Sequence, residues 1–259
     1  MCPRRLGQHF LADAAWRQRV LRSLGARPDD VWLEIGAGHG EMTRELARCA
    51  RRLVAIELDP PLVESLRRLA AETPNIVVAQ GDILALDLRH IAGVEHFRVY
   101  GSLPYYITSP ILRRLFEHAD AIQSIHIIVQ FEVAARLVAR PGRRDYGFLS
   151  VLTQFYAQPE IVFRIPPGAF RPQPKVASAL VSLAMRKERG APGVREEAQF
   201  LKFVGKCFAQ KRKTLLNNLR GLSGAERAAA ALRAAGLRSD ARAEQLDLSE
   251  FVVLFQSLA

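Results

Sequence analysis

Cysteine is scarce in this chain, which holds three among its 259 residues: Cys2, Cys49 and Cys207. They lack the CxxC or CxxxH spacing of metal and redox sites, so neither a disulfide framework nor a zinc site is expected. The histidines show no metal-ligand spacing either, and no bound metal is predicted. Such cysteine usage is typical of a reducing compartment, and the expected location is the cytoplasm.

Long apolar runs are also missing. No segment approaches the roughly 18 apolar residues that a transmembrane helix needs, so no membrane partner is expected. Acidic residues are outnumbered: 26 Asp and Glu stand against 37 Lys and Arg, giving a net charge of +11. That excess favours a polyanionic partner, most simply nucleic acid. An Arg-rich composition inherited from a GC-rich genome is the alternative explanation.

The order of apolar segments predicts the fold class. From residue 31 short apolar runs alternate with helix-like stretches, which is typical of a parallel sheet with crossover helices. Four prolines between residues 166 and 175 predict an extended segment rather than a helix. The predicted strands are 31–35, 53–56, 76–79, 97–100, 122–129, 158–163 and 178–185, and the predicted helices include 42–49, 132–139, 196–219, 225–235 and 249–258. We therefore expect a Rossmann-like α/β catalytic domain at 1–186 and a small all-α domain at 187–259.

A glycine-rich turn follows the first strand. Residues 34–40 read EIGAGHG, and Gly36 and Gly38 permit a tight turn that a ligand can approach closely. Glu41 stands where a dinucleotide fingerprint has Gly or Ala, and a carboxylate there would repel a pyrophosphate. A dinucleotide cofactor, and with it a dehydrogenase, is therefore not expected.

Two carboxylates follow the next strands. Glu57 ends the second predicted strand, where it can bind both ribose hydroxyls of an adenosine, and Asp82 follows the third, where it can accept from the adenine amino group. An acidic, phosphate-free pocket suits a nucleoside with a cationic substituent, and S-adenosylmethionine is such a molecule. The alternative makes both carboxylates ordinary helix caps.

The reacting group is predicted after the fourth strand, at residues 102–105 (SLPY). An oxygen of Ser102 and a main-chain carbonyl near Leu103 can each accept one N–H of an exocyclic amine, which aims its lone pair at a methyl donor. Pro104 removes a competing donor and fixes the turn. Tyr105 offers a ring on which a base can stack. These residues resemble the motif of amino methyltransferases.

Several further runs resemble the KsgA-type ribosomal RNA adenine dimethyltransferases over nearly the whole chain, from about Leu6. The runs are 7–11 (GQHFL), 34–40, 101–107, 108–110, 130–133, 146–150, 167–178, 210–218 and 242–246. The resemblance implies dimethylation at N6 of two adjacent adenosines in a hairpin loop near the 3′ end of small-subunit rRNA. It implies S-adenosylmethionine as donor, S-adenosylhomocysteine as product, and an assembling small ribosomal subunit as substrate; we expect a monomer.

The resemblance also assigns residues by position. The target base must be flipped out of its RNA to reach the site. The resemblance implies that the flipped base lies between Tyr105 on one face and Phe170 on the other. Two departures stand out: the family usually has Asn at the positions of Ser102 and His9. Tyr106 also departs from the family pattern and receives no role. The implied cofactor contacts are Gln8, His9, Leu11, Gly36, Gly38, Glu57, Asp82 and Ser102.

The N-terminal segment allows two interpretations. Residues 1–27 carry six arginines and one acid, Asp13, which is typical of a mitochondrial transit peptide. The alternative is a helix capped by Asp13, with an apolar stripe that includes Val20 and Leu24. We favour the helix because residues 7–11 carry a motif of the family.

A basic segment predicts the RNA-binding surface. Residues 202–220 hold six basic residues and no acid, and Lys202, Lys206 and Lys213 would share one face of a continuous helix. Such a face fits phosphate contacts, although a solvated charged face is the alternative. The predicted RNA contacts are Arg143, Arg144, Arg171, Lys175, Lys202, Lys206, Lys211, Arg212 and Lys213.

Two rival functions share these motifs. An Erm-type methyltransferase would act on one adenosine of large-subunit rRNA, but residues 210–214 and 242–246 look more like the small-subunit family. A non-catalytic paralogue, like the mitochondrial transcription factor B proteins, would bind nucleic acid without methylating it. Intact Glu57, Asp82 and Tyr105 argue against lost catalysis, whereas Ser102 keeps this rival open.

Overall fold

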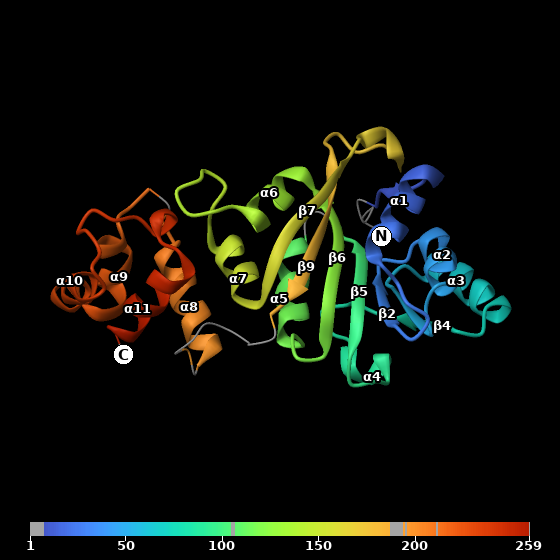
Figure 1. Cartoon of the computed structure of the whole chain (residues 1–259), viewed down its shortest axis with the longest axis horizontal. Coiled ribbons are helices and arrows are strands. Elements are labelled where there is room, and N and C mark those ends of the chain that lie inside the picture. Colours follow the sequence, from blue (N-terminus) through green and yellow to red (C-terminus); the bar gives the residue numbers. More distant parts are fainter. Residues whose placement is uncertain (1–7, 105–106, 187–193, 195, 211, 259) are drawn as a thin grey trace, which may run out of the picture. The chain divides into compact units, whose positions relative to one another are not determined.

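The computed structural model describes residues 8–104, 107–186, 194, 196–210 and 212–258 (Figure 1). The chain forms two compact units. The first contains Met1–Ala134 and Pro159–Met185, and the second contains Ala135–Gln158 and Arg186–Ala259. By its contacts, the segment 135–158 thus groups with the helices that follow residue 186. The functional division into a catalytic part, 1–186, and an RNA-binding part, 187–259, stays a prediction.

A seven-stranded sheet organises the first unit, with the order β4-β3-β2-β5-β6-β9-β7. The pairs from β4 to β6 are parallel, and β9 runs antiparallel to β6. The strands are β2 (Val31–Ile35), β3 (Arg52–Glu57), β4 (Ile76–Gln80), β5 (Phe97–Ser102), β6 (Ile122–Gln130), β7 (Ala157–Ile165) and β9 (Ser178–Met185). Each predicted strand is confirmed to within about two residues at either end. The order reverses between β2 and β5, where a ligand site is expected at the carboxyl ends.

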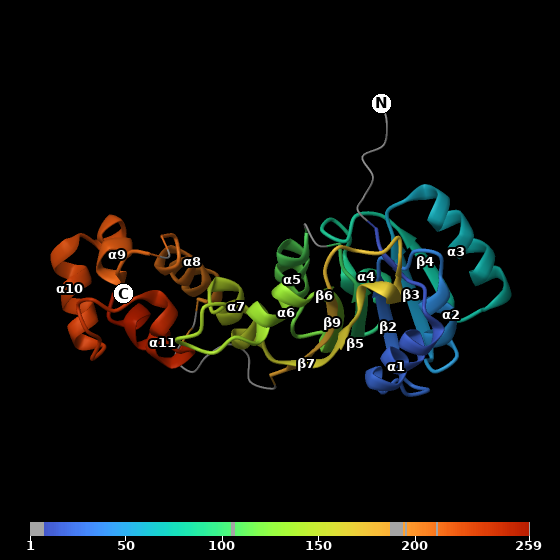
Figure 2. The same cartoon turned by 90° about the horizontal axis from the view of Figure 1, so that it is seen from above.

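Helices cover both faces of this sheet. Figure 2 shows α1 and α2 on one side and α5 on the other. In α1, Asp13 accepts a hydrogen bond from the Trp16 backbone N–H (3.0 Å), and Val20 and Leu24 are buried, so the predicted helix is confirmed. The helices are α1 (Ala14–Leu24), α2 (Glu41–Ala47), α3 (Pro60–Glu72), α4 (Leu88–Ala92), α5 (Thr108–Glu117) and α6 (Phe131–Val138).

A small two-stranded ladder joins distant parts of the first unit. β1 (Phe10–Leu11) pairs antiparallel with β8 (Phe170–Arg171), which places Leu11 opposite Phe170. Just before β8, residues Pro167–Ala169 form a turn of 3-10 helix, where we had expected none. Proline is tolerated there because the first N–H groups of a helix have no intrahelical partner.

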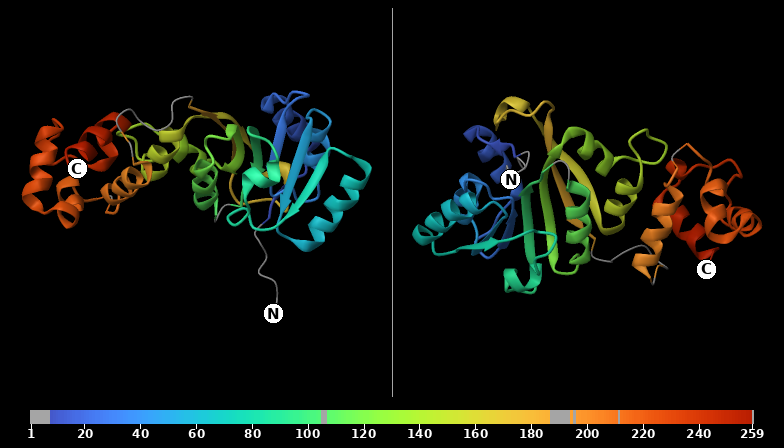
Figure 3. Two further views of the ribbon diagram at one scale, coloured as in Figure 1. Left: turned by 90° about the horizontal axis from the view of Figure 1, so that it is seen from below. Right: turned by 180° about the vertical axis from the view of Figure 1, so that it is seen from behind.

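The second unit is helical (Figure 3). Its interior contains packed aromatic rings. The Phe155 and Phe200 rings stack with centroids 5.2 Å apart, and the Tyr146 hydroxyl donates to the Leu246 carbonyl (2.8 Å). Its helices are α7 (Phe148–Tyr156), α8 (Glu197–Cys207), α9 (Leu215–Ser223), α10 (Ala225–Ala234), the short turn Ala243–Gln245 and α11 (Leu248–Gln256). Within the described part of the chain, none of the helices has the length and apolar character needed to cross a membrane.

The predicted helix 196–219 is wrong in its continuity, because α8 ends at Cys207 and α9 begins at Leu215. The Asn218 amide donates to the carbonyls of Cys207 (2.8 Å) and Gln210 (3.3 Å), which satisfies the end of α8. Lys213 consequently lies outside α8 and does not share a helix face with Lys202 and Lys206.

Candidate active site

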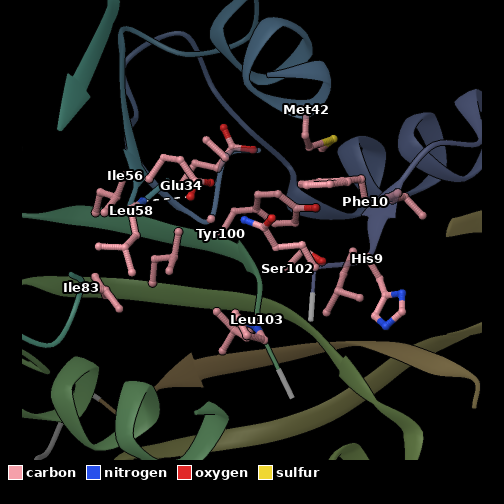
Figure 4. A pocket seen from close by; sticks show the side chains of 18 of the residues that line it. His9, Phe10, Glu34, Met42, Ile56, Leu58, Ile83, Tyr100, Ser102 and Leu103 are labelled. Atoms are coloured by element: carbon pink, nitrogen blue, oxygen red, sulfur yellow. Dashed lines mark hydrogen bonds between the residues drawn. The ribbon is translucent and has the colours of Figure 1, made fainter. Parts of the chain in front are cut away.

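A cavity opens at the carboxyl ends of β2, β3 and β5, where the strand order reverses (Figure 4). It lies entirely within the first unit. Of the residues predicted from sequence, ten line it: Gln8, His9, Leu11, Gly36, Glu57, Asp82, Ser102, Leu103, Pro104 and Phe170. Tyr105 and Tyr106 lie outside the described residues.

The glycine turn brings three segments together at this cavity. Gly36 has φ +70°, and a Cβ atom there would lie 3.4 Å from the carbonyl oxygen of Ser102 on β5. Gly38 has φ +60°, and its Cβ would lie 2.8 Å from the Phe10 ring on β1. Both positions therefore favour glycine for the left-handed backbone, and Gly38 also needs it for the close approach of the Phe10 ring.

Backbone N–H groups fix the Glu57 carboxylate at the end of β3. One oxygen accepts from Gly38 N (2.9 Å), and the other accepts from Leu58 N (2.8 Å) and Asp59 N (3.0 Å). The side chain is buried, at 5% exposure. Gly38 is not among the cavity-lining residues; it acts here by orienting Glu57. An oxygen that accepts one bond retains a lone pair for a ligand hydroxyl.

Asp82 borders the same cavity from the turn after β4. Its Oδ1 accepts from Leu84 N (2.9 Å), and the neighbouring Gly81 N donates to the Glu57 carbonyl (3.0 Å). These bonds hold the two carboxylates, Glu57 and Asp82, on adjacent turns at one edge of the sheet. The side chain of Asp82 is exposed, so it can accept a further hydrogen bond.

The segment after β5 is held by its neighbours. Leu103 N donates to the Ile128 carbonyl (3.0 Å), and the Leu103 side chain is buried. The Pro104 carbonyl accepts from Ile107 N (3.2 Å) and from the Thr108 hydroxyl (3.2 Å). That carbonyl is therefore occupied by the start of α5, which fixes the backbone around Ser102.

The ladder of β1 and β8 closes another side of the cavity. His9 Nδ1 lies 2.7 Å from the Pro172 carbonyl, and Ala12 N donates to the Ala169 carbonyl (2.9 Å). Because Phe170 is 1% exposed and lines the cavity, its ring is part of the wall in this structure. The ladder therefore links His9 and Leu11, which are predicted to bind the cofactor, to Phe170, which is predicted to contact the base.

Sequence reasoning missed Glu34 and Tyr100, which both reach the cavity from the strands (Figure 4). Glu34 is 2% exposed, and burial raises its pKa from 4.5 to about 8. Burial also raises the pKa of Tyr100 well above its usual range. The sequence did contain a signal for Glu34, which is an acid inside the apolar run VWLEI. Burying a carboxyl group costs free energy, so such a residue is a candidate for a functional role. Phe10 and Met42, also not predicted, line the cavity as well.

The charges around the cavity favour a cationic ligand. Its lining contains the carboxylates of Glu41, Glu57 and Asp82, the carboxyl group of Glu34, which its raised pKa keeps mostly neutral at pH 7, and one guanidinium, that of Arg17. Arg17 donates to the carbonyls of Leu11 and Ala12 and pairs with Glu45 (3.3 Å). This guanidinium is therefore already engaged, and the remaining charge is negative.

The residues predicted to bind RNA are exposed where they are described. Arg171 and Lys175 lie in the first unit, and Arg171 also donates to the carbonyls of Gly168 and Phe170. Lys211 is outside the described residues. The second unit carries Arg143, Arg144, Lys202, Lys206, Arg212 and Lys213. The described ranges contain no group of three or more His, Cys, Asp or Glu side chains that could hold a metal ion.

Comparison with known proteins decides the family. The family model described as "Ribosomal RNA adenine dimethylase" matches residues 3–259. The chain belongs to this family. The resemblance that the motifs predicted is thereby confirmed, as is the prediction of an rRNA-modifying methyltransferase.

Comparisons with individual proteins agree with this family assignment. "Ribosomal RNA small subunit methyltransferase A" of Koribacter versatilis (strain Ellin345) is 42% identical, over 98% of this chain and 93% of that protein. The 23S rRNA methyltransferase ErmE superposes with a TM-score of 0.73 at 31% identity, covering 96% of this chain and 99% of ErmE. A dimethyladenosine transferase from Plasmodium falciparum has a TM-score of 0.78 at 20% identity, covering 95% and 96%. The latter likeness concerns the fold, and the predicted Rossmann-like class is confirmed.

Proposed function

We propose that this chain transfers methyl groups from S-adenosylmethionine to N6 of two adjacent adenosines in the 3′-terminal hairpin loop of small-subunit rRNA. The products are N6,N6-dimethyladenosines, formed while the small subunit assembles. One observation carries the proposal: Glu57, Asp82 and Ser102 line one cavity in a chain of the dimethylase family. The 42% identical relative, which is named a small-subunit methyltransferase, supports the choice of subunit.

The cavity fits S-adenosylmethionine by its donor set. Glu57 is oriented to accept from ribose hydroxyls, and Asp82 can accept from the adenine amino group. Gly36 lines the cavity without a side chain, Gly38 orients Glu57, and Gln8, His9 and Leu11 of the N-terminal segment complete the wall. Bound S-adenosylmethionine supplies an electrophilic methyl group on a positively charged sulfur. The carboxylates of Glu41, Glu57 and Asp82 match that charge, and no bound metal is part of the proposal.

The residues after β5 orient the target amine. The Ser102 hydroxyl and a carbonyl near Leu103 each accept one N–H, which leaves the nitrogen lone pair directed at the methyl group. Leu103 N is fixed to Ile128 O and Pro104 O to α5, so the acceptors are held in place before the substrate arrives. Tyr105 and Phe170 are expected to contact the two faces of the base. No strong general base is needed, because the nitrogen loses its proton readily once methylated.

The basic residues position the RNA. Arg171 directly follows Phe170 of the cavity wall, Lys175 lies exposed four residues further along the chain, and Lys202 and Lys206 lie exposed on α8. Such side chains contact phosphates and set orientation without reading sequence. We further propose that the enzyme acts as a cytoplasmic monomer.

A second candidate is an Erm-type activity on one adenosine of 23S rRNA. The 31% identity with ErmE over 96% of this chain favours it. The higher identity with the small-subunit enzyme, 42%, favours the first candidate. A non-catalytic paralogue is disfavoured because the cavity retains both carboxylates and an acceptor at Ser102.

Methyl transfer distinguishes the candidates. Labelled S-adenosylmethionine is mixed with unmethylated small subunits or with large-subunit RNA, and the products are mapped by mass spectrometry. Dimethyladenosine at two neighbouring small-subunit positions supports the proposal, whereas label in large-subunit RNA supports the Erm-type activity. Cofactor binding without transfer would indicate a binding protein. Ser102→Asn is then the variant to test, because it introduces the longer acceptor that the family usually has.

A further inference from the structure

An apolar patch lies exposed beyond the end of β6, outside the cavity. Phe131, the first residue of α6, is 37% exposed, and Val162 on β7 and Val176 are 37% and 47% exposed. These are three of the eight large apolar side chains that are exposed among the described residues. Exposed apolar side chains that gather in one place indicate a binding surface more strongly than scattered ones.

Two contacts bring the patch together. The Phe131 backbone N–H donates to the Ala177 carbonyl (2.9 Å), next to Val176. The Arg164 guanidinium lies 4.8 Å from the centre of the Phe131 ring, in cation–π geometry. Val162 and Arg164 are two positions apart on β7 and are both exposed, so they project from the same face of that strand.

The patch borders the predicted site for the target base. Ser102 is in register with Ile128 on the neighbouring strand, and Leu103 N donates to the Ile128 carbonyl. Phe131 follows Ile128 by three residues and begins α6, directly after the end of β6; Figure 1 shows these two elements. At about 3.3 Å per residue along a strand, this places Phe131 roughly 10 Å beyond that pairing. A nucleotide neighbouring the target could therefore reach it.

We propose that Phe131, with Arg164 on its ring, is a stacking site for an unpaired base beside the target adenosine. This inference rests on the proposed function. An aromatic ring and a guanidinium both stack on bases, and Arg171 and Lys175 supply charge for the adjoining phosphates.

Cross-linking on the intact small subunit identifies what covers the ring. Photoreactive benzoylphenylalanine replaces Phe131 in the full chain, and the same probe at Val253 is the control, an exposed position (44%) on α11 in the second unit. We expect the probe at 131 to cross-link to nucleotides that flank the two methylated adenosines. Cross-links to a ribosomal protein or to distant RNA, or no cross-link at 131, would overturn the inference.

Substitutions test stacking itself. Phe131→Ala and Phe131→Leu should lower kcat/KM on small subunits roughly fivefold to a hundredfold, the range for losing one stacked base, and Phe131→Trp should restore it. A Leu variant as active as the Trp variant would contradict stacking. If the unaltered protein transfers no methyl groups, the proposed function itself fails. If the unaltered protein transfers methyl groups and the Phe131 variants are equally active, the proposed stacking site is contradicted and the proposed function stands.

Discussion

Glu34 is a carboxyl group buried in β2, and its raised pKa makes stability depend on pH. Its pKa of about 8 exceeds the ordinary 4.5, so between these values the folded state holds a proton that the unfolded state has released. Stability from this group is therefore present below pH 4.5 and is lost as the pH rises toward 8. At about 1.4 kcal/mol per pKa unit, the loss amounts to a few kcal/mol.

Glu34→Gln should remove this dependence, because the amide keeps the shape and cannot ionise. We expect the variant to gain stability over the unaltered protein between pH 5 and pH 8, by a few kcal/mol at most. Urea unfolding of the cofactor-free proteins at three pH values measures it. Glu64→Gln, which changes an exposed carboxylate of α3, is the control. Parallel pH curves for the Glu34 variant and the unaltered protein would contradict the buried, protonated carboxyl.

Gly38 and Gly142 separate backbone strain from crowding. Both have positive φ, +60° and +79°, but a Cβ meets the Phe10 ring at 2.8 Å at position 38 and nothing within 4 Å at position 142. Each Ala variant should lose about 1–2 kcal/mol of stability through strain. Only Gly38→Ala should also weaken cofactor binding, severalfold by calorimetry, because Phe10 and the N–H that orients Glu57 must shift. Equal cofactor affinities would show that the contact with Phe10 is unimportant.

Individual site residues were predictable from sequence where they lie at the ends of strands. Glu57, Asp82 and Ser102 stand at or within three residues of the ends of apolar runs, so the topology alone puts them at one edge. Glu34 and Tyr100 lie within the strands, and which cavity their side chains enter depends on neighbours across the sheet. That information is tertiary, and the sequence carries it weakly.

Among the elements, strands were easier to predict than helices. The predicted strand 31–35 coincides with β2, because a strand buried on both faces is an apolar run, broken here by Glu34 alone. Helix α7 was missed: six of its nine residues are buried, so it shows no clear apolar stripe. The break between α8 and α9 was missed because the side chain that satisfies the end of α8, Asn218, comes from a later position in the chain.

Asn218→Ala should destabilise the second unit. The amide donates to the carbonyls of Cys207 and Gln210, and losing it leaves the end of α8 without these donors. We expect a loss of about 1–2 kcal/mol in the free energy of unfolding, measured with urea. Asn217→Ala, at an exposed position on the same helix, is the matched control and should change little. Equal losses for the two variants would argue against the cap.

For the whole molecule, the charge of +11 predicts RNA binding that weakens with salt. Lys202→Gln and Lys206→Gln should each reduce the slope of log affinity against log salt concentration by about 0.7–0.9, one phosphate contact each. Binding to small subunits between 50 and 200 mM salt measures this. Arg68→Gln, 78% exposed on α3, is the control and should leave the slope unchanged. Unaltered slopes for both lysine variants would remove α8 from the RNA surface.

The ladder between β1 and β8 has a thermodynamic consequence for the enzyme as a whole. His9 and Leu11 are predicted to contact the cofactor, Phe170 is predicted to contact the base, and hydrogen bonds tie their strands together. A ligand that orders one of these strands also orders the other. The second ligand then pays a smaller cost in conformational entropy when it binds, so the two affinities are coupled. Reciprocity then requires that cofactor strengthen RNA binding by the same factor as RNA strengthens cofactor binding.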